Sequence, residues 1–137
     1  MYDVDEVLQH YIVTALWSSH DESDENGGEP MDANYGPDDL APETRETMRG
    51  EVADFLAGIE RERPGVYAEM AAGTVWSDPG QVGHDFWLTR NHHGVGFWDR
   101  YSGDQPSAEL GNYLTKQAHV YGEVDLYVGD DGKIHQS

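Results

Sequence analysis

The chain of 137 residues contains no cysteine, which excludes disulfide bonds and thiolate metal sites. Long apolar runs are also absent, and the longest falls far short of the roughly 20 residues that a membrane-spanning helix requires. Residues 1–6 lack the basic region of a secretory signal peptide. These absences predict a cytoplasmic protein that does not associate with membranes.

Basic residues are scarce. Eight lysines and arginines stand against 27 aspartates and glutamates, which gives a formal net charge of −19. The imbalance is greatest in residues 1–46, where Arg45 is the single base among 13 acids. A surface of this charge repels phosphate backbones and anionic lipids and attracts basic proteins. The composition therefore argues against direct nucleic-acid binding and favours a protein partner with a basic surface.

The same acidity has a second interpretation. The sequence holds only two lysines but 15 aspartates, a bias that is also typical of proteins from salt-adapted organisms. In such a protein the carboxylates keep the surface hydrated and play no part in recognition. Both interpretations follow equally from the composition.

Apolar residues recur at helical spacing in three long segments, which predicts three main helices. These helices are expected at residues 4–19, from Pro42 to about residue 61, and at residues 106–121. A short further helix is expected at residues 66–73. Residues 20–41, rich in Asp, Glu, Gly, Pro and Asn, are predicted to form a long acidic loop between the first two helices.

Two stretches favour antiparallel β-hairpins. Residues 124–135 contain the turn sequence Gly-Asp-Asp-Gly between two apolar runs. Residues 83–101 place an Asn-His-His-Gly turn between two aromatic runs, which sets Trp87 opposite Trp98 and Asp85 opposite Arg100. We therefore predict a single α+β domain over residues 1–137, with three main helices packed on a small antiparallel sheet built from two β-hairpins.

The predicted aromatic hairpin combines tryptophan with charged side chains, a composition common at binding surfaces. The candidate binding residues in this hairpin are Trp87, Trp98, Asp85, Arg100, Arg90 and His93. The acidic loop adds four further candidates, Asp21, Glu22, Asp24 and Glu25. The alternative is that both tryptophans simply belong to the hydrophobic core.

No spacing in the sequence identifies a metal site or a catalytic centre. The histidines of the hairpin lack a His-x-x-x-His or His-x-Glu partner. The acidic stretch that begins at Glu22 fails the calcium-loop template, because its twelfth position is Ala33 rather than glutamate. We predict no metal, no cofactor and no catalytic residue, while a general acid–base site at His84, Asp85 or Arg90 remains an alternative.

Several stretches resemble an uncharacterised family of small bacteriophage and virus proteins. They are GHDFWLTRN at residues 83–91, GFWDR at 96–100, YGEVDLYVGDDGK at 121–133 and, less closely, MDANY at 31–35. The resemblance implies a viral accessory protein that acts in the host cytoplasm, and it carries over no activity and no catalytic residue. His92 departs from the glycine expected at that turn position.

Together these observations predict a non-enzymatic, acidic viral accessory protein that binds a host or viral protein. A nucleic-acid-mimicking anti-restriction or other anti-defence inhibitor is the concrete form of this hypothesis. One alternative is a small enzyme or ligand-binding protein with its site at the aromatic hairpin, residues 84–100. The other is a salt-adapted domain whose acidity has no role in recognition.

Overall fold

The computed structural model describes residues 2–21, 28–94, 96–101 and 105–137. Its helices are α1 (Val4–Ser18), α2 (Pro42–Glu62), α3 (Val66–Ala71), α4 (Pro79–Arg90) and α5 (Pro106–His119). The short 3₁₀ turns are η1 (Met31–Ala33), η2 (Pro37–Asp39), η3 (Val75–Ser77) and η4 (Phe97–Asp99). The strands are β1 (His20–Asp21), β2 (Glu29–Pro30), β3 (Leu126–Val128) and β4 (Ile134–Gln136).

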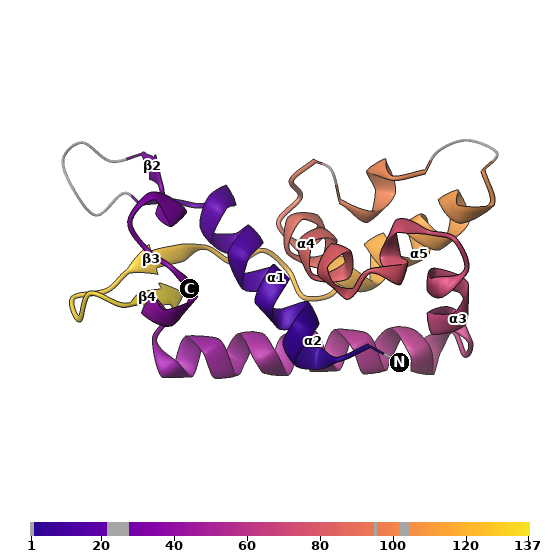
Figure 1. Cartoon of the computed structure of the whole chain (residues 1–137), viewed down its shortest axis with the longest axis horizontal. Helices are drawn as coiled ribbons and strands as arrows, with labels where there is room; N and C mark the ends of the chain where they lie inside the picture. Colours follow the sequence, from indigo (N-terminus) through magenta and orange to yellow (C-terminus); the bar gives the residue numbers. More distant parts are fainter. Residues whose placement is uncertain (1, 22–27, 95, 102–104) are drawn as a thin grey trace.

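The α+β class is confirmed in broad terms, but the predicted arrangement is not. Four of the described helices exceed seven residues, rather than three, and α4 is the additional one. The strands form two separate two-stranded antiparallel sheets, β1–β2 and β3–β4, which lie toward one end of the molecule (Figure 1). The helices therefore pack mainly on one another, and no sheet lies beneath them in the described part of the chain.

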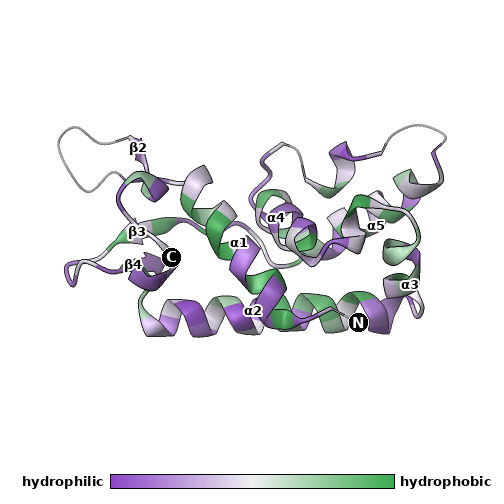
Figure 2. Ribbon diagram, in the orientation of Figure 1, coloured by the Kyte–Doolittle hydropathy of each residue, from purple (hydrophilic) through white to green (hydrophobic). Residues whose placement is uncertain are grey.

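Local sequence signals mark the first residues of the helices that apolar spacing predicted. Asp3 caps α1 by accepting hydrogen bonds from the backbone amides of Asp5 and Glu6 at 2.9 and 3.4 Å. Pro42 opens α2 and a second proline opens α5, at positions where a missing N–H costs nothing. Figure 2 shows hydrophobic stretches on α1 and on the part of α2 beneath α4 and α5, whereas the end of α2 near β4 is hydrophilic.

The predicted aromatic hairpin at residues 83–101 is wrong, because its first half is the helix α4. Asp78 caps this helix through the amide of Gly80 at 2.9 Å, and Pro79 occupies its first position. The residues of α4 are buried on nearly every side. A helix enclosed in this way has no solvent-exposed polar face. The 3.6-residue alternation of apolar and polar residues that identifies surface helices is therefore absent from its sequence.

Trp87 and Trp98 consequently do not form the predicted cross-strand pair. Trp87 lies in α4 with an exposed fraction of 2% and meets the ring of Tyr11 edge-on. Trp98 lies in η4 and is half-buried. For Trp87, the alternative that it belongs to the core is correct.

The core forms where α1, α2 and α4 meet. Phe55 of α2 stacks on Phe86 of α4 with ring centroids 4.1 Å apart, and Tyr11 of α1 lies 5.3 Å from the same Phe86 ring. The apolar residues that recur at helical spacing along α2 are buried, with Val52, Phe55 and Ile59 all at most 1% exposed. The contact between α1 and α4 is the most extensive between any two of the described elements.

Gly83 allows the close approach of α1 and α4. A Cβ atom at this position would lie 2.2 Å from the carbonyl oxygen of Val7 and 2.9 Å from the amide nitrogen of Tyr11. We expect Gly83→Ala to lower the free energy of unfolding by about 1–3 kcal/mol or more, because the helices must separate. Gly50→Ala is the matched control: its Cβ would meet nothing within 4 Å on the exposed side of α2. That change should stabilise the protein by about 0.5–1 kcal/mol. Urea denaturation measures both, and equal effects would contradict the close approach.

The predicted C-terminal hairpin is confirmed. Strands β3 and β4 pair in antiparallel register with Val128 opposite Ile134, and the turn between them closes through Gly129 N to Lys133 O at 2.8 Å. The hairpin joins the start of α2, since the amide of Ala41 donates to the carbonyl of Ile134 at 2.9 Å. The predicted acidic loop, residues 20–41, is more ordered than expected at its described ends, which contain β1, β2, η1 and η2.

Candidate functional site

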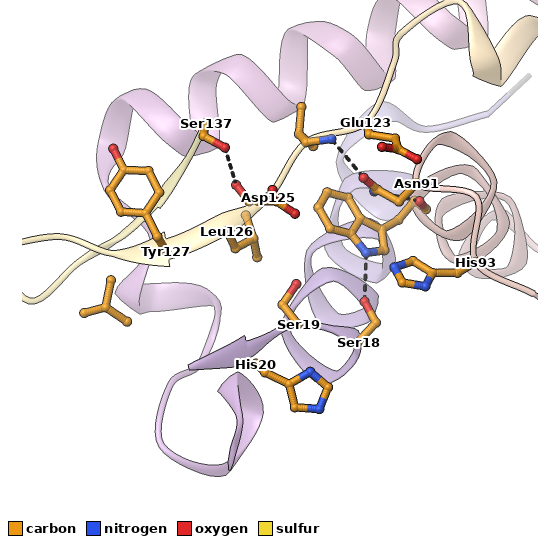
Figure 3. Close-up of a pocket in the computed structure, with 13 residues that line it drawn as sticks. Ser18, Ser19, His20, Asn91, His93, Glu123, Asp125, Leu126, Tyr127 and Ser137 are labelled. Atoms are coloured by element: carbon orange, nitrogen blue, oxygen red, sulfur yellow. Dashed lines mark hydrogen bonds between the residues drawn. The ribbon is translucent and has the colours of Figure 1, made fainter. Parts of the chain in front are cut away.

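A cavity of about 810 Å³ opens beside the β3–β4 hairpin (Figure 3). Its lining comes mainly from three places: the end of α1 with the residues that follow, the end of α4 with the residues that follow, and β3 with the extended segment that leads into it. Ser137 completes the lining. The lining residues are Ser18, Ser19, His20, Trp87, Asn91, His93, Glu123, Val124, Asp125, Leu126, Tyr127, Val128 and Ser137. This volume lies within the range of ligand pockets in proteins.

Hydrogen bonds between the three segments hold the pocket walls together. The indole Nε1 of Trp87 donates to the hydroxyl of Ser18 at 2.8 Å, which joins the ends of α4 and α1. Asn91 caps α4 and accepts a hydrogen bond from the amide of Val124 through Oδ1 at 2.9 Å. Its Nδ2 donates to the carbonyl of Trp87 at 3.0 Å. Asn91 thus ties the end of α4 to the segment that carries Glu123 and Asp125.

The pocket favours positive charge for two independent reasons. Helices α1 and α4 both end at it, and the C-terminus of a helix carries the negative end of its dipole. Glu123 and Asp125 add two carboxylates from alternate positions of one extended segment. Neither lysine nor arginine occurs among the described residues that line the pocket. A cation entering the pocket meets acceptors and no fixed positive charge.

Further carboxylates lie at the same end of the molecule as the pocket, on what we call the acidic end: residues 28–46 and 123–137. These two segments contain ten acids and two bases, Arg45 and Lys133. They meet in space, since Leu40 bridges to Ile134 and His135 lies 3.7 Å from the carboxylate of Glu43. Figure 1 shows β2, β3, β4 and the start of α2 at the same end of the molecule.

Asp85 and Arg100, both predicted to bind a partner, form an ion pair with each other in which the Asp85 carboxylate is fully buried. The Asp85 side chain is fully buried and receives Arg100 at 2.8 and 3.0 Å, together with Trp76 Nε1 at 2.8 Å. His84 Nδ1 lies 2.8 Å from the same carboxylate, and Gln81 Nε2 lies 2.9 Å from it. Burial alone raises the pKa of Asp85, but the hydrogen bonds from these side chains outweigh it and hold the pKa below its ordinary value. The two residues meet as predicted, although through a helix and not through a hairpin.

Arg90 is also a buried structural residue, with an exposed fraction of 0%. Its guanidinium donates to the hydroxyl of Tyr11 at 3.0 Å and to the carbonyls of Gly122 and Tyr121, each at 2.9 Å. The carboxylate of Glu51 lies 3.0 Å away. The contacts to residues 121 and 122 fix the segment that carries the pocket carboxylates, so Arg90 acts on the pocket by positioning its wall.

Of the remaining predicted site residues, some line the pocket, some lie outside it and some fall outside the described residues. His93 and Trp87 line the pocket, whereas Trp98 is not among its lining residues. Asp21 is largely buried in β1. Three candidates, Glu22, Asp24 and Glu25, lie outside the described residues.

Sequence reasoning missed most of the pocket. The missed lining residues with polar side chains are Ser18, Ser19, His20, Asn91, Glu123, Asp125, Tyr127 and Ser137. The alternation of Glu123 and Asp125 in an extended segment was the one available signal, because alternate residues of such a segment share a side.

The described residues contain neither a cluster of metal ligands nor a membrane-spanning helix. No group of three or more His, Cys, Asp or Glu side chains is arranged to hold a metal ion within residues 2–21, 28–94, 96–101 and 105–137. In the same part of the chain, no helix combines the length and apolar composition needed to cross a membrane.

Comparison of the chain with known protein families, curated proteins and solved structures finds no match. The resemblance to bacteriophage and virus proteins therefore stays a prediction.

Proposed function

We propose that this protein binds a protein partner with a basic surface through its acidic end. The observation that carries the proposal is the meeting of two acidic segments that are separated by more than 70 residues of sequence. Their combined charge is ten acids against two bases. A concentrated negative surface raises the rate of encounter with a basic protein and suppresses contact with acidic ones.

The way the arginines are used supports this proposal. Each of the following arginines lies within 4 Å of a carboxylate: Arg49, Arg61, Arg63, Arg90 and Arg100. All of them lie outside the acidic end. Within it, the guanidinium of Arg45 donates to the backbone carbonyl of Pro37 at 3.1 Å. Arginine thus contributes little compensating charge at the acidic end, where nine of the ten acidic residues are exposed.

The concrete form of the proposed function is a virus-encoded inhibitor that acts in the host cytoplasm. Its carboxylates would occupy the phosphate-binding surface of a nucleic-acid-binding defence protein, such as a restriction enzyme. Exposed carboxylates on separate elements, including Asp32 of η1, Asp38 of η2 and Glu46 of α2, suit this role because a phosphate-binding surface is broad. The role requires no catalytic residue.

Charge neutralisation tests the proposal. The variant Asp32→Asn, Asp38→Asn, Glu46→Gln, Asp130→Asn removes four exposed charges from the acidic end. We expect affinity for the partner, captured from host lysate and then purified, to fall about tenfold or more, with little change in melting temperature. Raising the salt concentration should weaken the wild-type complex, because salt screens exposed charges. Isothermal titration calorimetry measures the dissociation constants.

The matched control removes four charges elsewhere: Glu6→Gln, Glu60→Gln, Glu62→Gln, Glu109→Gln. It changes the net charge equally and should retain most of the affinity. Equal losses in both variants would show that net charge, and not the acidic end, drives binding. A melting temperature that climbs steeply with KCl, with no partner captured at any salt concentration, would favour the salt-adapted interpretation and contradict the proposal.

A further inference from the structure

The pocket itself has chemistry that a broad acidic surface does not need. It is a cavity of about 810 Å³ with two helix C-termini, two carboxylates and several hydroxyl groups in its walls. An acidic surface that only attracts a partner at long range requires no concave site. The cavity is therefore suited to a group of defined shape that enters it.

We propose that this pocket receives an arginine side chain of the basic partner, an inference that rests on the proposed function and specifies its contact. The guanidinium carries five N–H donors in a rigid planar fork and has no acceptor. The pocket offers the complementary set, with acceptors at Glu123 and Asp125 and at the hydroxyl of Ser19. The cavity is larger than one side chain, so it also has room for the residues that flank the arginine.

The positions of the carboxylates suit this occupant. Glu123 is exposed over 66% of its side chain, and Asp125 is exposed as well, so neither carboxylate is committed to the core. The backbone that carries them is fixed by Asn91 through the amide of Val124 and by Arg90 through the carbonyl of Gly122. A rigid backbone with accessible carboxylates lowers the ordering cost of binding.

Aromatic groups complete the site. Tyr127 is half exposed and lies among the lining residues, and its ring stacks on the ring of His135 with centroids 5.5 Å apart. A guanidinium group stacks favourably on an aromatic face, so Tyr127 offers an apolar surface for the arginine stem or head. Trp87, held by Ser18, closes the inner wall.

An NMR titration with defined peptides tests this inference on the whole chain, without any natural partner. The probe is an acetylated and amidated Gly-Gly-Arg-Gly-Gly peptide, and its control carries citrulline, the neutral isostere, in place of arginine. We expect the arginine peptide to shift the indole N–H resonance of Trp87 and the amide resonances of Asn91 and Val124. The citrulline peptide should bind at least tenfold more weakly.

Two charge-matched variants separate pocket binding from diffuse attraction. Glu123→Gln, Asp125→Asn should weaken the arginine peptide at least fivefold, whereas Asp32→Asn, Asp38→Asn, which removes two charges outside the pocket, should weaken it less than twofold. Equal binding of both peptides, or unchanged affinity in the Glu123/Asp125 variant, would overturn the inference. Spermidine that binds the pocket more tightly than the arginine peptide would assign the site to a free polyamine and overturn it too.

Failure of this inference differs from failure of the proposed function. If the partner binds and the Glu123/Asp125 variant keeps full affinity for both partner and peptide, the acidic end recognises the partner without the pocket. If the arginine peptide binds the pocket but neutralising the acidic end leaves partner affinity unchanged, the pocket assignment stands and the proposed function fails.

Discussion

Replacing Arg90 with methionine is expected to lower the free energy of unfolding by about 3–5 kcal/mol, as loss of one partner from a buried ion pair usually does. The guanidinium is fully buried and binds a carboxylate, a phenol and two backbone carbonyls that come from three parts of the chain. Burial raises the pKa of Tyr11, so its phenol stays protonated and accepts the hydrogen bond from Arg90. Methionine fills the space but leaves these acceptors without a donor.

Arg90→Lys is the informative companion variant. Lysine keeps the charge, but its compact ammonium group cannot span the four acceptors that the fork of arginine reaches. We expect a loss intermediate between the wild type and Arg90→Met. Adding Glu51→Gln to Arg90→Met should recover part of the stability, because the partly buried carboxylate that has lost its cation is then removed. Urea denaturation measures all four proteins, and a lysine variant as stable as the wild type would contradict the structural role of the fork.

Asp85→Asn is expected to cost about 3–5 kcal/mol of unfolding free energy at pH 7, because it removes a fully buried charge that pairs with the partly buried Arg100. An asparagine also directs an N–H group at one of the donors that now surround the carboxylate. Those donors include Trp76 Nε1 and Gln81 Nε2, which hold Asp85 from two directions. The network joins α4 to the segments on both sides of it.

The cost of this substitution should depend on pH in a defined direction. The pKa of Asp85 in the folded protein lies below its ordinary value of 3.8. A carboxylate with a depressed folded pKa contributes stability that is fully present above its unfolded pKa and is lost as pH falls through the folded pKa. The difference in stability between wild type and Asp85→Asn should therefore be constant above about pH 5 and shrink below about pH 4. Thermal unfolding of both proteins from pH 7 to pH 3 measures it, and a difference as large at pH 3 as at pH 7 would mean that the fold does not lower the pKa of Asp85.

The contact between Asp85 and Arg100 was predicted correctly, but from a hairpin that does not form. Asp85 and Arg100 were matched through a cross-strand register, yet they meet because one turn of α4 faces the residues after η4. His84 joins the same carboxylate as its neighbour in sequence, and the carboxylate can only accept, so the ring carries its hydrogen on Nδ1. An acid–base site at these residues was one alternative, but in the fold Asp85 is enclosed and engaged by donors.

The missed helix had a recognisable start. Asp78 followed by Pro79 is a standard opening for a helix, with a capping side chain and a proline at the first position. The aromatic residues after it, such as Phe86 and Trp87, favour strands in isolation. Burial on all sides then removed the polar face that would have revealed helical periodicity. Intrinsic preference indicated a strand, and tertiary contact with α1 at Gly83 favours the helix.

Local sequence determined the elements whose signals act over a few residues. Apolar residues at helical spacing predicted α1, α2 and α5, and the turn at Gly129 predicted the β3–β4 hairpin, because these signals lie within a short stretch of chain. Only the tertiary structure decided where α4 packs, how Asn91 and Arg90 hold the segment around Glu123, and how the two acidic segments meet at one end of the molecule. Those arrangements depend on contacts between residues far apart in sequence, and neither composition nor periodicity encodes such contacts in a readable form.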